Sequence, residues 1–139
     1  MKIEVYTDGS CKPTNPGPAG FGFVVLFDGE IYSSGGNFLG HGTNNIAEVM
    51  GIQHTLEMLK SLDYLDSDIT VYTDSQYAVG LFTKNWKPKA NIALIRKTKS
   101  LVGDFSDLKI VWVRGHDGNK YTELADELAR NSIDAALIL

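Results

Sequence analysis

Two acidic residues end segments of the chain that have nearly the same sequence. Asp8 ends the stretch Val-Tyr-Thr-Asp and is followed by Gly-Ser. Asp74 ends the second stretch, also Val-Tyr-Thr-Asp, and is followed by Ser-Gln. Ligand sites in α/β proteins collect at the carboxyl ends of sheet strands, so we expect both carboxylates in one crevice. A structural alternative stays open for each, because aspartate also stabilises turns and helix starts.

Glu48 and Asp126 are two further acids, both expected near the start of helices. Glu48 follows Asn45 by three residues, which is the spacing of a capping box. Asp126 lies where a negative charge favours the helix dipole. If all four carboxylates converged, they would repel one another unless cations lay among them, and magnesium prefers such hard oxygen ligands. Two ions could then clamp the attacking water and the leaving oxygen of a phosphodiester.

The elements that would position these acids follow from the hydrophobic pattern. Alternation predicts a strand over residues 2–8, and an apolar run with an Asp-Gly turn predicts an antiparallel hairpin after it. The further expected elements are helices over 43–62, 75–82, 91–102 and 121–137, and strands over 68–73 and 108–113. The order βββαβααβα predicts an α/β fold with a five-stranded mixed sheet, three strands antiparallel and then two parallel. We expect one domain over residues 1–139, without repeats or linkers.

Charge is distributed unevenly, although the net charge of the chain is only −4. Residues 84–99 contain six lysines and arginines and no acid, so the rest of the chain is strongly acidic. A positive segment of this kind suits contact with a phosphate backbone. It is equally typical of a solvated loop and helix face, and charge alone does not separate the two.

Composition excludes several other classes of protein. The single cysteine, Cys11, cannot form an internal disulfide, and the spacing of one cysteine and three histidines gives no zinc site. The N-terminus is a strand without the long apolar stretch of a signal peptide. No apolar run approaches the length of a membrane span. We therefore expect a cytoplasmic protein that does not associate with membranes.

Six short motifs occur in order along the whole chain. They are Tyr6–Cys11, Asn15–Pro18 followed by Gly20, Thr43–Asn45 with Glu48, Thr73–Tyr77, Val113–His116, and Ala125–Ala129. In residue types and order they resemble the type 1 ribonuclease H family. The resemblance implies a ribonuclease H-like fold. It also implies an endonuclease that hydrolyses the RNA strand of RNA/DNA hybrids and leaves 5′-phosphate and 3′-hydroxyl ends.

The same resemblance implies a role for each matching residue. The expected ligands of two Mg²⁺ ions, bound together with substrate and replaceable by Mn²⁺, are Asp8, Glu48, Asp74 and Asp126. His116 would assist proton transfer or product release. The expected substrate contacts are Asn15, Asn44 and Gln76 for the 2′-hydroxyls of the RNA strand, Thr43 and Asn91 for a DNA phosphate, and Lys87 and Lys89 in the basic segment.

Two departures from the family pattern change these expectations. The segment between Asp74 and Asn91 is short, as in members without the basic helix-loop handle, so we expect weaker hybrid binding that depends more on residues 84–99. Thr122 stands where an asparagine would support Asp126.

The expected state is a monomer. The alternative from another class is a non-catalytic hybrid-binding module on the same fold, and the complete set of acids with His116 favours catalysis.

Overall fold

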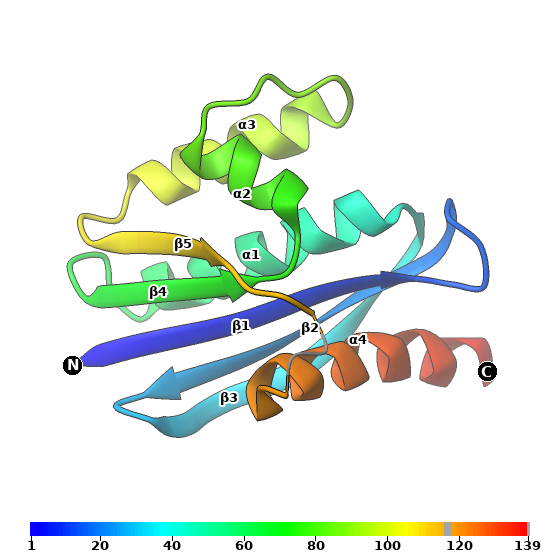
Figure 1. Cartoon of the computed structure of the whole chain (residues 1–139), viewed down its shortest axis with the longest axis horizontal. Coiled ribbons are helices and arrows are strands. Elements are labelled where there is room, and N and C mark those ends of the chain that lie inside the picture. The colour runs from blue at the N-terminus through cyan, green and yellow to red at the C-terminus, as the bar shows by residue number, and fades with distance from the viewer. Residues whose placement is uncertain (116–117, 139) are drawn as a thin grey trace.

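A five-stranded sheet with helices on both faces forms the molecule, as seen in a computed structural model that describes residues 1–115 and 118–138 (Figure 1). The elements are β1 (Lys2–Cys11), β2 (Gly17–Phe27), β3 (Glu30–Gly42), α1 (Asn44–Ser61), β4 (Asp68–Thr73), α2 (Gln76–Thr83), α3 (Ile92–Gly103), β5 (Leu108–Trp112) and α4 (Lys120–Ile138). The order βββαβααβα is the predicted one, and each predicted helix overlaps an observed helix. Within the described residues, no helix has the length and apolar character needed to cross a membrane.

Strand β1 lies in the middle of the sheet, whose spatial order is β3-β2-β1-β4-β5. It runs antiparallel to β2 and parallel to β4, and β4 runs parallel to β5. Thr7 of β1 pairs with Thr73 of β4, so the next residues, Asp8 and Asp74, leave the same edge of the sheet on neighbouring strands. Because the two strands are parallel and in this register, the two similar sequences bring their aspartates to the same place.

Helix α1 covers one face of the sheet, with α2 and α3 on the same side (Figure 1). Alternate residues of β1, including Ile3 and Val5, are fully buried beneath it. Ile52 and Leu56, spaced four apart on α1, are fully buried in the same cluster. Burial of this apolar stripe fixes the rotation of α1, and with it the direction of the polar residues in its first turn.

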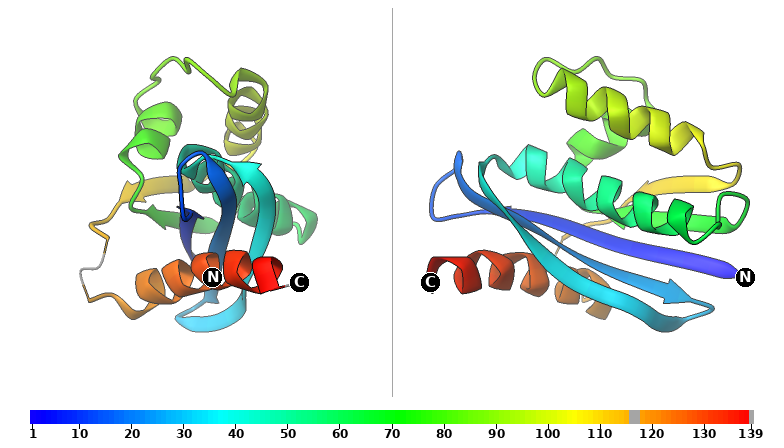
Figure 2. Two further views of the ribbon diagram at one scale, coloured as in Figure 1. Left: turned by 90° about the vertical axis from the view of Figure 1, so that its right-hand side faces the viewer. Right: turned by 180° about the vertical axis from the view of Figure 1, so that it is seen from behind.

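Helix α4 lies on the opposite face, along β1, β2 and β3 (Figure 2). It approaches the sheet closely because Gly22 and Gly36 pair across β2 and β3 and carry no side chain. A Cβ at Gly22 would collide with the backbone of Ala125, and one at Gly36 with that of Leu128. Gly22 also pairs with Asp8, so this contact sets how far the first turns of α4 stand from the end of β1.

Candidate active site

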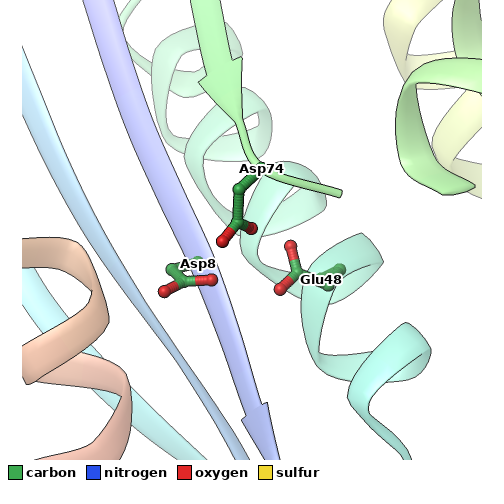
Figure 3. A group of neighbouring side chains, drawn as sticks. All are labelled: Asp8, Glu48 and Asp74. Atoms are coloured by element: carbon green, nitrogen blue, oxygen red, sulfur yellow. The ribbon is translucent and has the colours of Figure 1, made fainter. Parts of the chain in front are cut away.

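Three carboxylates meet beside the first turns of α1, where the pairing of β1 with β4 ends. Asp8 comes from β1, Asp74 follows β4, and Glu48 projects from α1 (Figure 3). One ligand oxygen of each lies within 4.8 Å of the others, an arrangement that can hold a metal ion. The sequence-based prediction that Asp8 and Asp74 share a crevice is confirmed, and Glu48 joins them.

Neither capping interpretation survives for these acids. The residue that caps α2 is Ser75, whose Oγ accepts a hydrogen bond from the Ala78 amide at 3.0 Å. Helix α1 is capped by Thr43, whose Oγ1 accepts from the Ile46 amide at 3.1 Å. The carboxylate of Glu48 is therefore not needed to satisfy a helix end.

Glu48 is instead held in place by the end of β1. The Gly9 amide donates a hydrogen bond to Glu48 Oε1 at 2.8 Å, and the Thr73 hydroxyl lies 3.4 Å from Oε2. Gly9 is required here, because a Cβ would come within 2.5 Å of the Glu48 amide nitrogen. Sequence reasoning missed this role of Gly9; its position directly after the strand-end acid is the only signal for it.

The electrostatics of the three acids are those of a site that lacks positive charge. Burial, followed by the charges of Glu48 and Asp74, raises the pKa of Asp8 far above its ordinary range. Burial and the charge of Asp74 also raise the pKa of Glu48, although the Gly9 amide opposes this. Among the described residues, no lysine or arginine forms an ion pair with any of the three. A cation would relieve their mutual repulsion.

Asp126 borders the same cavity but has a different partner. It lies on α4 and contributes to the raised pKa of Asp8, yet it is not one of the three acids that lie within 4.8 Å of one another. Arg130, one turn further along, donates from Nε to Asp126 Oδ2 at 3.2 Å. The spacing of four residues could have indicated this pair, which sequence reasoning did not consider.

A cavity of about 440 Å³ opens over the acids and collects the residues expected to contact the RNA strand. Its lining includes all four acids, Asn44 and Gln76. Asn15 lies nearby, and its side-chain oxygen accepts from the Asn44 amide at 3.1 Å. The expected RNA contacts therefore surround the carboxylates.

A larger cavity of about 700 Å³ adjoins the acidic one, and Asn45 and Tyr77 line both. Thr43 and Asn91, which are expected to contact the DNA strand, line this cavity, and so do Lys87 and Lys89, the expected substrate contacts of the basic segment. Asn15 and Trp86 also line it. His116, the remaining predicted residue, lies outside the described residues. The placement of Lys87 and Lys89 on a cavity wall favours the binding interpretation of the basic segment over a solvated face.

A mixed sheet of this order, with acids gathered at the ends of its central strands, defines the class of ribonuclease H-like folds. The family model for RNase H matches residues 1–134. Ribonuclease H of Pseudoalteromonas atlantica is 38% identical, over 99% of this chain and 94% of the relative, and that of Salmonella arizonae is 35% identical, over 93% and 87%. The chain belongs to the RNase H family.

Solved structures agree with this assignment. RNase H1 from the halophilic archaeon Halobacterium salinarum superposes with a TM-score of 0.78 at 31% identity, covering 97% of this chain and 99% of that one. LC11-RNase H1 in complex with an RNA/DNA hybrid superposes with a TM-score of 0.84 at 30% identity, covering 98% and 99%. The predicted fold class is confirmed, and the chain is a nuclease of the hydrolase class.

Proposed function

We propose that this enzyme hydrolyses the RNA strand of RNA/DNA hybrids with two divalent metal ions and leaves 5′-phosphate and 3′-hydroxyl ends. The observation that carries the proposal is the group formed by Asp8 and Glu48, which are buried, and Asp74, which is half-buried, within a cavity whose rim bears amide side chains. The hybrid bound by LC11-RNase H1, a structural neighbour over nearly the whole chain, supports the substrate class.

The donor set fits Mg²⁺ or Mn²⁺, since it consists of carboxylate oxygens without histidine or thiolate ligands. Asp8, Glu48 and Asp74 would hold one ion, and Asp126 would complete the pair of sites with Asp8. Bound divalent cations activate water and stabilise the developing charge on a phosphodiester in this kind of chemistry. The Gly9 amide keeps Glu48 Oε1 oriented before any cation binds.

The polar side chains that line the acidic cavity, Asn44 and Gln76, would select the RNA strand. Asn44 and Gln76 are placed beside the acids, where amide groups can donate to and accept from a 2′-hydroxyl. The DNA strand would lie in the adjoining cavity, with Thr43 and Asn91 near a phosphate and Lys87 and Lys89 supplying charge. His116 would assist proton transfer or product release.

Cleavage of matched substrates tests the proposal. We expect a labelled RNA/DNA hybrid to be cut in Mg²⁺ or Mn²⁺ and to stay intact in chelator, and duplex DNA and duplex RNA of the same sequence to be cut far more slowly. Ligation of the products to acceptor oligonucleotides distinguishes 5′-phosphate from 5′-hydroxyl ends. Binding of the hybrid without cleavage in either metal would support the non-catalytic module instead.

The basic segment provides an independent test of the DNA-strand cavity. Replacing both Lys87 and Lys89 with glutamine should weaken hybrid binding and lower the slope of log affinity against log salt by about 1 to 2. Lys97 is the comparison within the same segment and should contribute less than either cavity lysine, since it lies on α3 outside the lining of this cavity, with its Nζ 3.7 Å from Glu57. An equal loss of salt slope in Lys97→Gln would assign the charge effect to the segment as a whole.

A further inference from the structure

Both tryptophans of the chain border one small cavity beside the acidic site. Trp86 follows α2 and Trp112 ends β5, and together with Gln76, Val79 and Lys84 they line a space of about 310 Å³. The two indoles are 47% and 40% exposed, respectively. Exposed aromatic side chains also occur singly elsewhere on the surface, but here two indoles share one recess and can offer their flat faces to one ligand.

Each indole is fixed by contacts to the rest of the fold. The Trp86 ring lies directly against Gly80 of α2, where a Cβ would collide with it, and the Trp86 amide donates to the Gly80 carbonyl at 3.1 Å. Trp112 donates from its indole nitrogen to the backbone carbonyl of Asp74 at 3.1 Å. Two rings held in this way need little ordering when a flat ligand binds.

The recess adjoins the catalytic cavity. Gln76 lines both, and the hydrogen bond from Trp112 reaches the same residue whose carboxylate belongs to the acidic group. The recess also borders the cavity assigned to the DNA strand, because Trp86 lines both, whereas Gln76 and Trp112 line the recess and not that cavity. A group bound in the recess would therefore belong to a nucleotide near the reacting phosphodiester.

The charge at the recess is positive. Lys84 lines it and places its Nζ 5.9 Å from the centroid of the Trp86 ring. Aromatic faces next to a cation are the usual surface for single-stranded nucleic acid, because every base offers a flat π face and every nucleotide a phosphate. The volume, at the lower limit of small-ligand pockets, suits one base rather than a helical stack.

We propose that this recess, bordered by Trp86, Trp112 and Lys84, is a subsite for an unpaired nucleobase in a single-stranded continuation of the hybrid. A hybrid inside a cell ends in junctions where one strand continues unpaired, and such a base is free to stack. The proposal rests on the proposed function for its substrate. It extends that function by assigning the enzyme a preference for cleavage near hybrid ends that carry single-stranded extensions.

Binding experiments in chelator test the subsite without cleavage. A labelled 12-base-pair hybrid is compared with four versions that carry three unpaired nucleotides at one of the four strand ends, so that RNA and DNA extensions are separated. We expect at least one extension to tighten binding about fivefold, a modest value for stacking of one base. If no extension tightens binding, the proposal is overturned.

A pair of variants separates stacking from the structural hydrogen bond. Trp112→Phe and Trp112→Leu both lose the donor to Asp74, but only phenylalanine keeps an aromatic face. The ratio of blunt to extended dissociation constants should stay near the wild-type value in Trp112→Phe and fall to about 1 in Trp112→Leu. Phe38→Leu, at an aromatic residue 42% exposed on β3 and outside the recess, is the control and should keep the full ratio. Retention of the full ratio by Trp112→Leu would exclude the subsite.

Fluorescence gives a second measurement. Trp86→Phe leaves Trp112 as the only tryptophan, so its emission should be quenched more by the extended hybrid than by the blunt one. Equal quenching by the two would contradict stacking at Trp112. Cleavage of the blunt hybrid by the wild-type enzyme reports separately on the proposed function, since its failure would leave these binding comparisons unaffected.

Discussion

The carboxylates of Asp8, Glu48 and Asp74 are held differently from that of Asp126. The first three are set by the ends of two sheet strands and the first turns of α1, where Glu48 accepts from the Gly9 amide. Asp126 is set by the packing of α4 on the sheet and is paired with Arg130 within its own helix. Among the described residues, the first three acids therefore have no basic partner, whereas Asp126 forms an ion pair with Arg130.

This difference indicates two kinds of cation site. At the buried group, burial and mutual repulsion raise the pKa values of Asp8 and Glu48, so a cation would replace bound protons. At Asp126 a cation must compete with a guanidinium instead. The first site depends on strand register and the second on helix packing and a surface ion pair, so the two should respond differently to mutation.

The largest contrast is expected between Asp74→Asn and Asp126→Asn. Loss of Asp74 removes a ligand from the buried group, so hybrid cleavage should fall by about a thousandfold or more, in line with several kcal/mol of lost transition-state stabilisation. Asp126→Asn makes the same change from carboxylate to amide outside the group of three acids, at a side chain that already pairs with Arg130, so its loss should be smaller. Single-turnover cleavage rates in Mg²⁺ measure both.

Circular dichroism of the two variants should match the wild type, because neither carboxylate supports a helix cap or strand pair. Asp134→Asn is the control on α4, since Asp134 is exposed and pairs only with Lys12 among the ion pairs of the described residues. Wild-type rates in Asp74→Asn would refute the buried group as the catalytic centre. Equal losses in the two variants would remove the distinction between them.

A smaller effect is expected on stability in chelator. The folded protein keeps protons on Asp8 and Glu48 that the unfolded chain releases above pH of about 4, so the free energy of unfolding should fall as pH rises from about 5 to 8. Asp8→Asn removes one of the two groups that take up a proton on folding. The variant should show a smaller decrease of unfolding free energy with pH. At pH 8 it should be more stable than the wild type by about 1–3 kcal/mol. Urea unfolding at both pH values gives the comparison.

Adding Mg²⁺ should reverse the loss of stability at high pH. A bound cation favours the ionised carboxylates, so Mg²⁺ should restore wild-type stability at pH 8 and have little effect on Asp8→Asn. A wild-type protein equally stable at pH 5 and pH 8 in chelator would contradict the electrostatic description of the buried group.

The sequence predicted the frame of this site better than its details. Alternation and helical spacing predicted the element order, and the matched stretches ending in Asp8 and Asp74 predicted their convergence, because a parallel strand pair leaves few other arrangements. Glu48 was undecided between a capping box and the site. That choice depends on whether Thr43 or Asn45 caps the helix, which local sequence does not separate since both are good caps.

The features that the sequence did not reveal are contacts between distant segments. The hydrogen bond from Gly9 to Glu48 and the close packing of α4 against Gly22 form only when the sheet and helices pack together. Trp86 and Trp112 are separated by β5 and α3 in the chain, so their shared recess has no sequence signature. Roles implied by the family resemblance, such as that of His116, stay predictions.

The smallest expected effect concerns the ion pair that distinguishes Asp126. Arg130→Met frees Asp126 Oδ2 for a cation while keeping the apolar stem of the side chain. The Mg²⁺ concentration for half-maximal cleavage should fall about threefold to fivefold, since an exposed pair contributes up to about 1 kcal/mol. Arg130→Lys should change it less because the charge remains, and Lys12→Gln, which breaks another pair on α4, should not change it at all. A higher requirement for Mg²⁺ in Arg130→Met would mean that Arg130 orients Asp126 for the cation rather than competing with it, and the two parts of the site would then be built on the same principle.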